Sequence, residues 1–334
     1  MFVRNRTSHE PVLARGHIDD QTSVACVAVR VDYRVRPDGA LGMLRGERSE
    51  DELPDVRRHA VWLGVSVTAS GLVRPPVRAP FTRIVRLEVG DARHELTVFG
   101  PRRWRRESGG DLVPSTPEPF EPVPLTWSHA FGGSAVLEPG YLPGTELPHP
   151  GGKLVYPLNP DGVGFYPSAS AALEQPLPQI EYSDCLIRRW HDRPEPAGFA
   201  PCPALAGLRL RTTELSRSIA TSRDASMRAN AEELAVNALR MHHHAPGRLV
   251  VARLARGTRL RLEGLGSGAC AFTVPESPIA VRWQGSRQRN GEIPGRLRAL
   301  HIDAENTTVS IVFAHARSYP SDSPPSWIHV EQAA

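Results

Sequence analysis

The stretch Pro124-Leu-Thr-Trp-Ser-His-Ala-Phe-Gly-Gly133 opens a long segment, residues 120–199, that is dense in proline and glycine. Three further motifs follow it: Asn159-Pro-Asp-Gly-Val-Gly-Phe165, Leu177-Pro-Gln-Ile180 and Pro196-Ala-Gly-Phe-Ala-Pro201. Because proline and glycine interrupt helices and favour turns, long helices are not expected here. Disordered segments are poor in aromatic residues, whereas aromatic residues recur throughout this one. We therefore predict an ordered surface that is built from loops.

The segments on both sides of these loops alternate apolar and polar residues, as strands do. Thr22–Val35 is rich in β-branched residues, and Ile84–Val89 is joined to His94–Phe99 through Gly90-Asp91 as in a β-hairpin. Further short strands are predicted at 248–254, 258–262, 271–274, 280–283, 299–302 and 307–313. The pattern predicts a mainly β fold of antiparallel, sandwich or barrel-like sheets.

One segment, Thr213–Met241, shows helical periodicity, and Pro246-Gly247 follows its end. We therefore expect one amphipathic helix. The chain divides into five segments, which can form one integrated domain. They are an antiparallel β region in 1–119, the loop region in 120–212, the helix in 213–245, a second β region in 246–317 and an extended tail in 318–334.

The composition is that of a soluble globular protein, with 334 residues of which 40% are hydrophobic and 23% charged. No run of about 20 apolar residues occurs, and the Arg-containing start has no apolar region behind it. We therefore predict a cytoplasmic protein with no membrane partner. The four cysteines have neither zinc-ligand spacing nor a disulfide pattern, so buried free thiols are expected.

The residues that could carry chemistry are few. His242, His243 and His244 are adjacent, and successive helical residues point about 100° apart, so the three cannot converge on one ion while a helix persists. We predict no metal and no cofactor, and leave open whether this triplet binds metal. His129, His191 and Asp192 could act as general bases, although a lone histidine is more often structural. Neither a nucleophile elbow nor a phosphate loop is present.

An ordered series of short motifs spans nearly the whole chain and resembles the bacterial domain of unknown function numbered 2169. The motifs include Gly100-Pro-Arg-Arg-Trp104, Ala130-Phe-Gly-Gly133, Asn159-Pro160 and Pro196-Ala-Gly-Phe-Ala-Pro201. The resemblance implies a non-enzymatic adaptor or chaperone that loads a toxic effector onto the spike of a type VI secretion system. Its implied partners are the effector and the spike protein, with no nucleic acid.

A protein-binding surface needs exposed aromatic and arginine side chains on a rigid scaffold. We therefore predict that the partner contacts Arg102, Arg103, Trp104, Arg105, Trp127, Phe131, Gly132, Gly133 and Phe199. On this hypothesis, replacing either tryptophan by alanine weakens partner binding and leaves the protein folded. Alternatively, Phe131-Gly-Gly133 fills the β core while the glycines adopt positive φ.

Two other functions remain open on the sequence alone. A β-sandwich hydrolase or carbohydrate-active enzyme would show turnover that alanine at His129, His191 or Asp192 abolishes. A nucleic-acid-binding protein, with Arg102–Arg106 on the phosphates, would lose affinity steeply as salt rises. The adaptor hypothesis predicts instead a stable complex with the product of a neighbouring gene.

Overall fold

The computed structural model describes residues 2–17, 21–44, 64–136, 147–149, 153–156, 158–201, 245–285, 291–293 and 295–333. The chain forms two compact units. Unit 1 comprises Met1–Val67, Val250–Leu260 and Cys270–Ala334, and unit 2 comprises Thr68–Leu249 and Arg261–Ala269. The two ends of the chain therefore belong to one unit, a grouping that differs from the five expected segments. The predicted helix, the histidine triplet and Cys202 lie outside the described residues.

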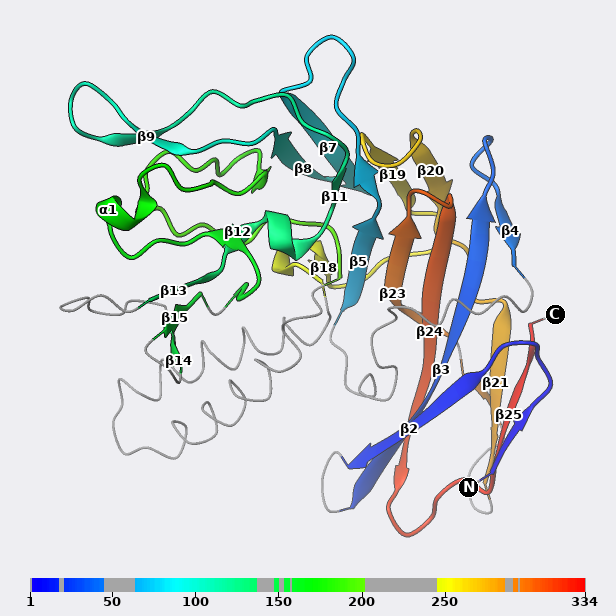
Figure 1. The fold of residues 1–334 in the computed structure, drawn as a ribbon. Helices are drawn as coiled ribbons and strands as arrows, with labels where there is room; N and C mark the ends of the chain where they lie inside the picture. The colour runs from blue at the N-terminus through cyan, green and yellow to red at the C-terminus, as the bar shows by residue number, and fades with distance from the viewer. Residues whose placement is uncertain are drawn as a thin grey trace. The chain divides into compact units, whose positions relative to one another are not determined.

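Unit 1 is built on a seven-stranded sheet with the order β18-β5-β23-β24-β3-β2, in which β4 also pairs with β3. Figure 1 shows its two long strands, β3 and β24, side by side, and they pair antiparallel from Thr308↔Arg34 to Pro320↔Thr22. The bounds are β2 (Pro11–His17), β3 (Thr22–Val35), β4 (Leu41–Met43), β5 (Val65–Ser70), β18 (Val250–Val251), β23 (Arg296–Asp303) and β24 (Thr308–Pro320). The strand predicted at Thr22–Val35 is confirmed.

The centre of β3 is buried on consecutive residues, so both faces of this strand are covered. Small side chains pack together on one face, where Cys26 and Ala28 meet Ala299, Val312 and Ala314. Burial of the Cys26 thiol raises its pKa to about 11. The expectation of buried thiols is met at Cys26 and Cys270, whereas Cys185 is exposed.

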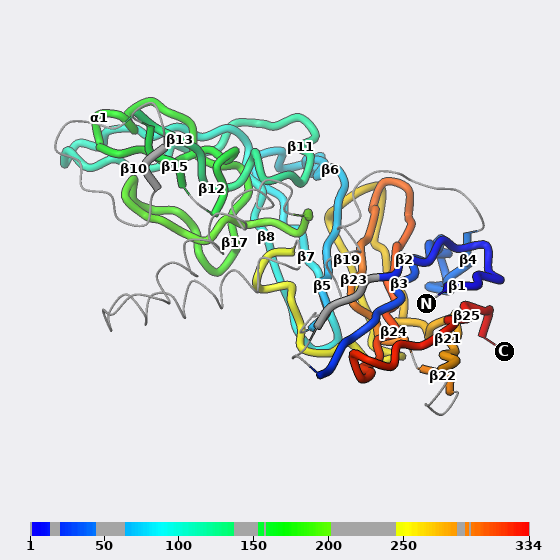
Figure 2. The backbone as a smooth tube through the Cα atoms, turned by 90° about the horizontal axis from the view of Figure 1, so that it is seen from below, coloured from blue at the N-terminus to red at the C-terminus, as the bar shows by residue number. Residues whose placement is uncertain are grey.

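A second sheet of unit 1 has the order β1-β25-β21-β22. Its strands are β1 (Phe2–Asn5), β21 (Ile279–Gln284), β22 (Gly291–Ile293) and β25 (Trp327–Gln332). β20 (Cys270–Thr273) immediately precedes β21 in the chain. β1 pairs with β25 in parallel, and both carry chain ends, as Figure 2 shows. The segment 318–334, expected as an extended tail, therefore supplies the end of β24 and all of β25.

Unit 2 contains a sheet in which β17 (Ile180–Tyr182), β8 (Ala92–Phe99), β7 (Thr82–Val89) and β19 (Arg259–Glu263) follow one another. The predicted hairpin of β7 and β8 is confirmed, and Gly90 in its turn has a φ of +61°. A strand predicted at 248–254 is mostly wrong. Residues 247–249 form the 3₁₀ turn η3 (Gly247–Leu249), and only Val250 and Val251 pair, as β18.

The rest of unit 2 consists of short paired strands and turns. The pairs are β6 (Leu72–Val73) with β11 (Val123–Pro124), β9 (Trp104–Arg106) with β10 (Leu112–Pro114), and β12 (Phe131–Gly132) with β16 (Val163–Gly164). β15 (Lys153–Val155) lies between β13 (Ser134–Val136) and β14 (Leu147–His149); the helical turns are η2 (Trp127–His129) and α1 (Ala169–Ala172). The mainly β, mostly antiparallel fold class is thereby confirmed, with parallel pairing at β1–β25 and β12–β16. No described helix has the length and apolarity that crossing a bilayer requires.

Burial gives unit 1 a pH-dependent stability. It lowers the pKa of His301 on β23 to about 4; the negative charge of Asp303 opposes this shift, and the positive charge of Arg30 adds to it. The unfolded chain therefore binds a proton that the folded chain excludes as the pH falls from about 6.5 to 4, so this histidine destabilises the fold across that window by up to about 3 kcal/mol.

We predict that His301→Gln flattens the pH dependence of unfolding in that window. Urea unfolding at pH 7 and at pH 4.5 measures it, and the loss of stability between the two should be smaller in the variant than in the native chain. The pH 7 value serves as the control for packing changes, because the histidine is neutral there in both states. Parallel curves for the two proteins would contradict the assignment.

Candidate functional site

A buried ion pair joins three loops of unit 2. Arg102, after β8, pairs with the carboxylate of Glu181 on β17, and both side chains are almost fully buried. The Arg102 Nη2 also donates to the Pro178 carbonyl at 2.8 Å, and its guanidinium carbon lies 3.6 Å from the centre of the Phe99 ring. The Ile187 N–H donates to Glu181 Oε2 at 2.7 Å. Burial raises the pKa of Glu181, whereas the Arg102 charge and the hydrogen bond from the Ile187 N–H act to lower it.

A second buried polar group, Asn159, locks the first motif to the second. Its Nδ2 donates to the Trp127 carbonyl at 2.7 Å and to the Phe131 carbonyl at 3.1 Å. Its backbone carbonyl accepts from the Gly133 N–H at 2.8 Å. Gly132 has a φ of +153°, and a Cβ there would lie 2.1 Å from the Asn159 carbonyl oxygen. Only glycine fits this approach, which explains the glycine in the motif.

Aromatic residues from several segments of unit 2 form a buried core. Trp104, Phe131, Tyr156 and Phe165 belong to one buried cluster, in which the Phe131 and Tyr156 rings meet edge to face with centroids 5.0 Å apart. Trp104 is 1% exposed. The alternative in which Phe131 fills the core therefore matches its position.

The remaining aromatic candidates are also buried. The Trp127 Nε1 donates to the Ala200 carbonyl at 3.0 Å, so the last motif packs against the first. The Phe199 side chain is fully buried, and its carbonyl accepts from the Ala69 N–H at 2.7 Å. The four aromatic side chains are at most 9% exposed, and both glycines of the first motif are buried: Trp104, Trp127, Phe131, Phe199, Gly132 and Gly133. The expectation that these rings are exposed is therefore corrected, because they pack in the core. Arg102, also predicted to contact the partner, is 6% exposed and is corrected in the same way.

Two of the predicted contact residues are exposed. Arg103 and Arg105 lie on either side of Trp104 in the chain. Their side chains are exposed while that of Trp104 is buried, because successive residues of an extended strand face opposite sides. The Arg103 Nη1 donates to the Glu174 carbonyl at 3.0 Å. Within the described chain, no hydrogen bond or ion pair engages the Arg105 side chain. Trp104 therefore anchors a strand that presents arginine to solvent.

A second loop presents arginines in the same manner, and its residues were not among the predicted contacts. Ile187 is buried in the cluster that contains Trp104, while Arg188 and Arg189 are exposed. Asp192 Oδ2 fixes the turn by accepting from the N–H groups of Arg188 and Arg189 at 3.0 and 2.9 Å. We call residues 103–106 and 188–189 the arginine loops. In the sequence this loop is marked by the pair Arg188-Arg189. That the neighbouring Ile187 packs in the same cluster as Trp104 is visible only in the fold.

The predicted general bases have structural roles. His129 Nδ1 lies 3.1 Å from the Gln179 Oε1, and the His191 ring packs edge-on against Trp190 with centroids 5.5 Å apart. Asp192 holds the turn described above. Within the described ranges, no group of three or more His, Cys, Asp or Glu side chains is arranged to hold a metal ion.

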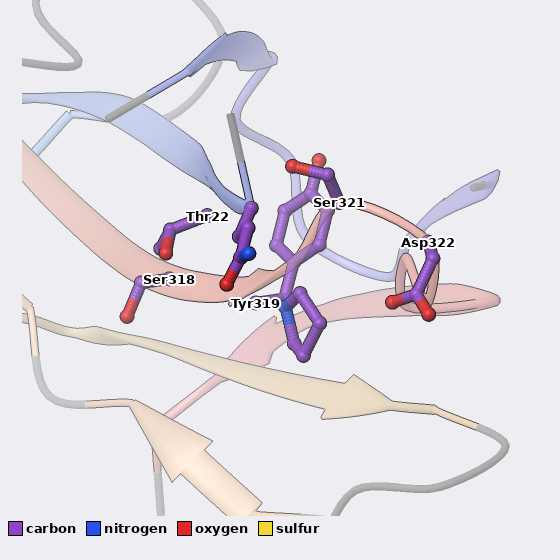
Figure 3. Close-up of a pocket in the computed structure, with 7 residues that line it drawn as sticks. Thr22, Ser318, Tyr319, Ser321 and Asp322 are labelled. Carbon is purple, nitrogen blue, oxygen red and sulfur yellow. The ribbon is translucent and has the colours of Figure 1, made fainter. Parts of the chain in front are cut away.

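Unit 1 has a polar hollow of about 600 Å³ near the ends of β3 and β24. Figure 3 shows the hydroxyl-bearing Thr22 and Ser318 on the adjacent strands β3 and β24. Asp322 lies in the turn that follows β24. The hollow is lined by Gln21, Thr22, Ser318, Tyr319, Pro320, Ser321 and Asp322. These hydroxyl and amide groups can bind a polar ligand. The lining supplies one carboxyl group, whereas glycoside hydrolysis ordinarily uses two.

Together, a mainly β fold and a loop region held by buried polar anchors define a scaffold of the kind that presents surface loops. Comparison with known proteins adds a family: "Uncharacterized protein conserved in bacteria (DUF2169)" matches residues 20–314. The chain belongs to this family. No curated protein and no solved structure matches it.

The buried pair gives a double-mutant test. Arg102→Met leaves the Glu181 carboxylate buried without its cation, so we expect a loss of about 3–5 kcal/mol in the free energy of unfolding. The double variant Arg102→Met, Glu181→Gln should recover most of that loss, because neither charge remains and the amide oxygen can still accept from the Ile187 N–H. Chemical denaturation of the three proteins measures both effects. A double variant as unstable as the single one would show that the charges are not coupled.

The burial of Trp104 reverses the outcome first expected of its mutation. Trp104→Ala should cost about 3–5 kcal/mol of stability, because it empties a packed core. The neighbouring exposed variant Arg105→Ala should change stability by less than about 0.5 kcal/mol. Thermal unfolding followed by circular dichroism compares them. Equal stability of the two variants would place the indole outside the core.

Proposed function

We propose that the chain is a non-enzymatic adaptor that binds a type VI secretion effector in the bacterial cytoplasm and helps to load it onto the spike. Membership of the family supports the proposal through the resemblance described above. The observation that carries it is the alternation at the start of β9, where the buried Trp104 lies between the exposed Arg103, which precedes the strand, and the exposed Arg105. Arginine is among the residues that dominate interface energies, and a fixed backbone reduces the entropy lost on binding.

The arginine loops suit an acidic protein surface. A guanidinium presents five donors in a planar fork and pairs with carboxylates through two parallel hydrogen bonds. Both loops are anchored in one core cluster, through Trp104 and Ile187. A partner that contacts both loops meets a surface whose geometry exists before binding. The predicted contact residues thereby reduce to Arg103 and Arg105, with Arg188 and Arg189 added.

Co-purification with the products of neighbouring genes tests the proposal. A tagged full-length chain should retain an effector or spike protein. Arg105→Glu should raise the dissociation constant of that complex at least tenfold, which corresponds to about 1.4 kcal/mol. The matched control is Arg78→Glu, an exposed arginine of unit 2 outside the arginine loops, which should change it less than twofold.

Each result has a definite meaning. If neither an effector nor a spike protein is retained, the adaptor function is contradicted. If a complex forms and Arg105→Glu binds as the native chain does, the adaptor stands and the arginine loops are not its contact. Turnover of a glycoside or ester that alanine at His129 or Asp192 abolishes would instead establish the enzyme alternative.

A further inference from the structure

A cleft of about 390 Å³ in unit 1 is lined by four arginines from two separate segments of the chain. Arg253 and Arg256 follow β18, and Arg296 and Arg298 begin β23. The lining also contains the apolar residues Val65, Leu254, Val274, Leu297 and Phe313. None of these residues belongs to the arginine loops.

Among the described residues that line this cleft, arginines outnumber acidic residues. Glu276 is the one acidic residue of the described lining. It forms an ion pair with Arg256, and the two side chains are 69% and 71% exposed. Such exposed pairs are weak and exchange readily. Within the described residues, no hydrogen bond or ion pair engages the side chain of Arg253 or Arg296.

The backbone of β23 is irregular at this cleft. Leu297 pairs with Phe313 and Ala299 pairs with Val312, so that Arg298 is the extra residue of a β-bulge. In a regular strand, consecutive side chains face opposite sides. The bulge breaks that alternation at the place where three consecutive residues, 296–298, line one hollow. Burial lowers the pKa of Arg298, an effect that Cys26 opposes and that the charge of Arg296 reinforces.

We propose that this cleft binds an extended, acidic polypeptide segment whose carboxylates pair with Arg253 and Arg296. Charge complementarity selects the occupant. The volume also favours a peptide over a single small anion, because it is more than ten times the roughly 30 Å³ of one water molecule. The mixed lining suits acidic side chains that alternate with apolar ones. The inference goes beyond the adaptor proposal, and it is tested without any effector or spike protein.

The experiment measures fluorescence polarisation of a labelled peptide in which Glu and Leu alternate, added to the full-length chain. The native chain should bind it, and the same peptide with Gln in place of Glu should not bind. Arg253→Glu, Arg296→Glu should raise the dissociation constant at least tenfold. The matched control, Arg34→Glu, Arg36→Glu, changes the charge equally on exposed residues of unit 1 outside the cleft and should have less than a twofold effect.

Three results would overturn the proposal. Equal weakening by both double variants would mean that net charge alone attracts the peptide. Equal binding of the Gln peptide would remove the carboxylates from the interaction. Displacement of the peptide by inorganic phosphate at matched charge concentration would assign the cleft to small anions. If the double variant Arg253→Glu, Arg296→Glu has a lower unfolding midpoint than the native chain, the uncharged double variant Arg253→Gln, Arg296→Gln is used in its place and its peptide affinity is compared with that of the native chain.

Discussion

The buried pair of Arg102 and Glu181 is the constraint on which the loop region depends. A segment without long helices or strands has few repeated backbone hydrogen bonds, so other groups must fix its path. One guanidinium meets a carboxylate, a carbonyl and an aromatic ring, and the carboxylate in turn holds the Ile187 N–H. Because burial makes an unpaired charge costly, the loops that supply these groups are held together.

The residues of these motifs have two roles. The residues that point inward, such as Trp104 and Phe131, fill the core, and Asn159 joins two loops through their carbonyls. Arg103 and Arg105 point outward from this fixed backbone, and Arg103 also donates to the Glu174 carbonyl. The proposed adaptor uses the second set. A separate arginine-lined cleft in unit 1 would allow the same chain to engage a second acidic segment.

Local patterns predicted the fold where contacts are local, and failed where they are not. The alternation in Thr22–Val35 and the turn at Gly90-Asp91 gave a strand and a hairpin that the structure confirms. The aromatic residues of the loops were expected at the surface, because no pattern among turns distinguishes an inward ring from an outward one. Arg102 and Glu181 are 79 positions apart, and the cleft joins Arg253 to Arg296; neither pairing is visible without the fold.

Amide hydrogen exchange of the native chain tests most directly whether buried polar anchors hold the loops rigid. The N–H groups of Ile187, Gly133 and Leu177 donate to the Glu181 carboxylate and to the Asn159 and Arg102 carbonyls. The account predicts that these three amides exchange as slowly as those of β7 and β8 in the adjoining sheet. Exchange at the rate of an unstructured peptide, while β7 and β8 remain protected, would contradict it.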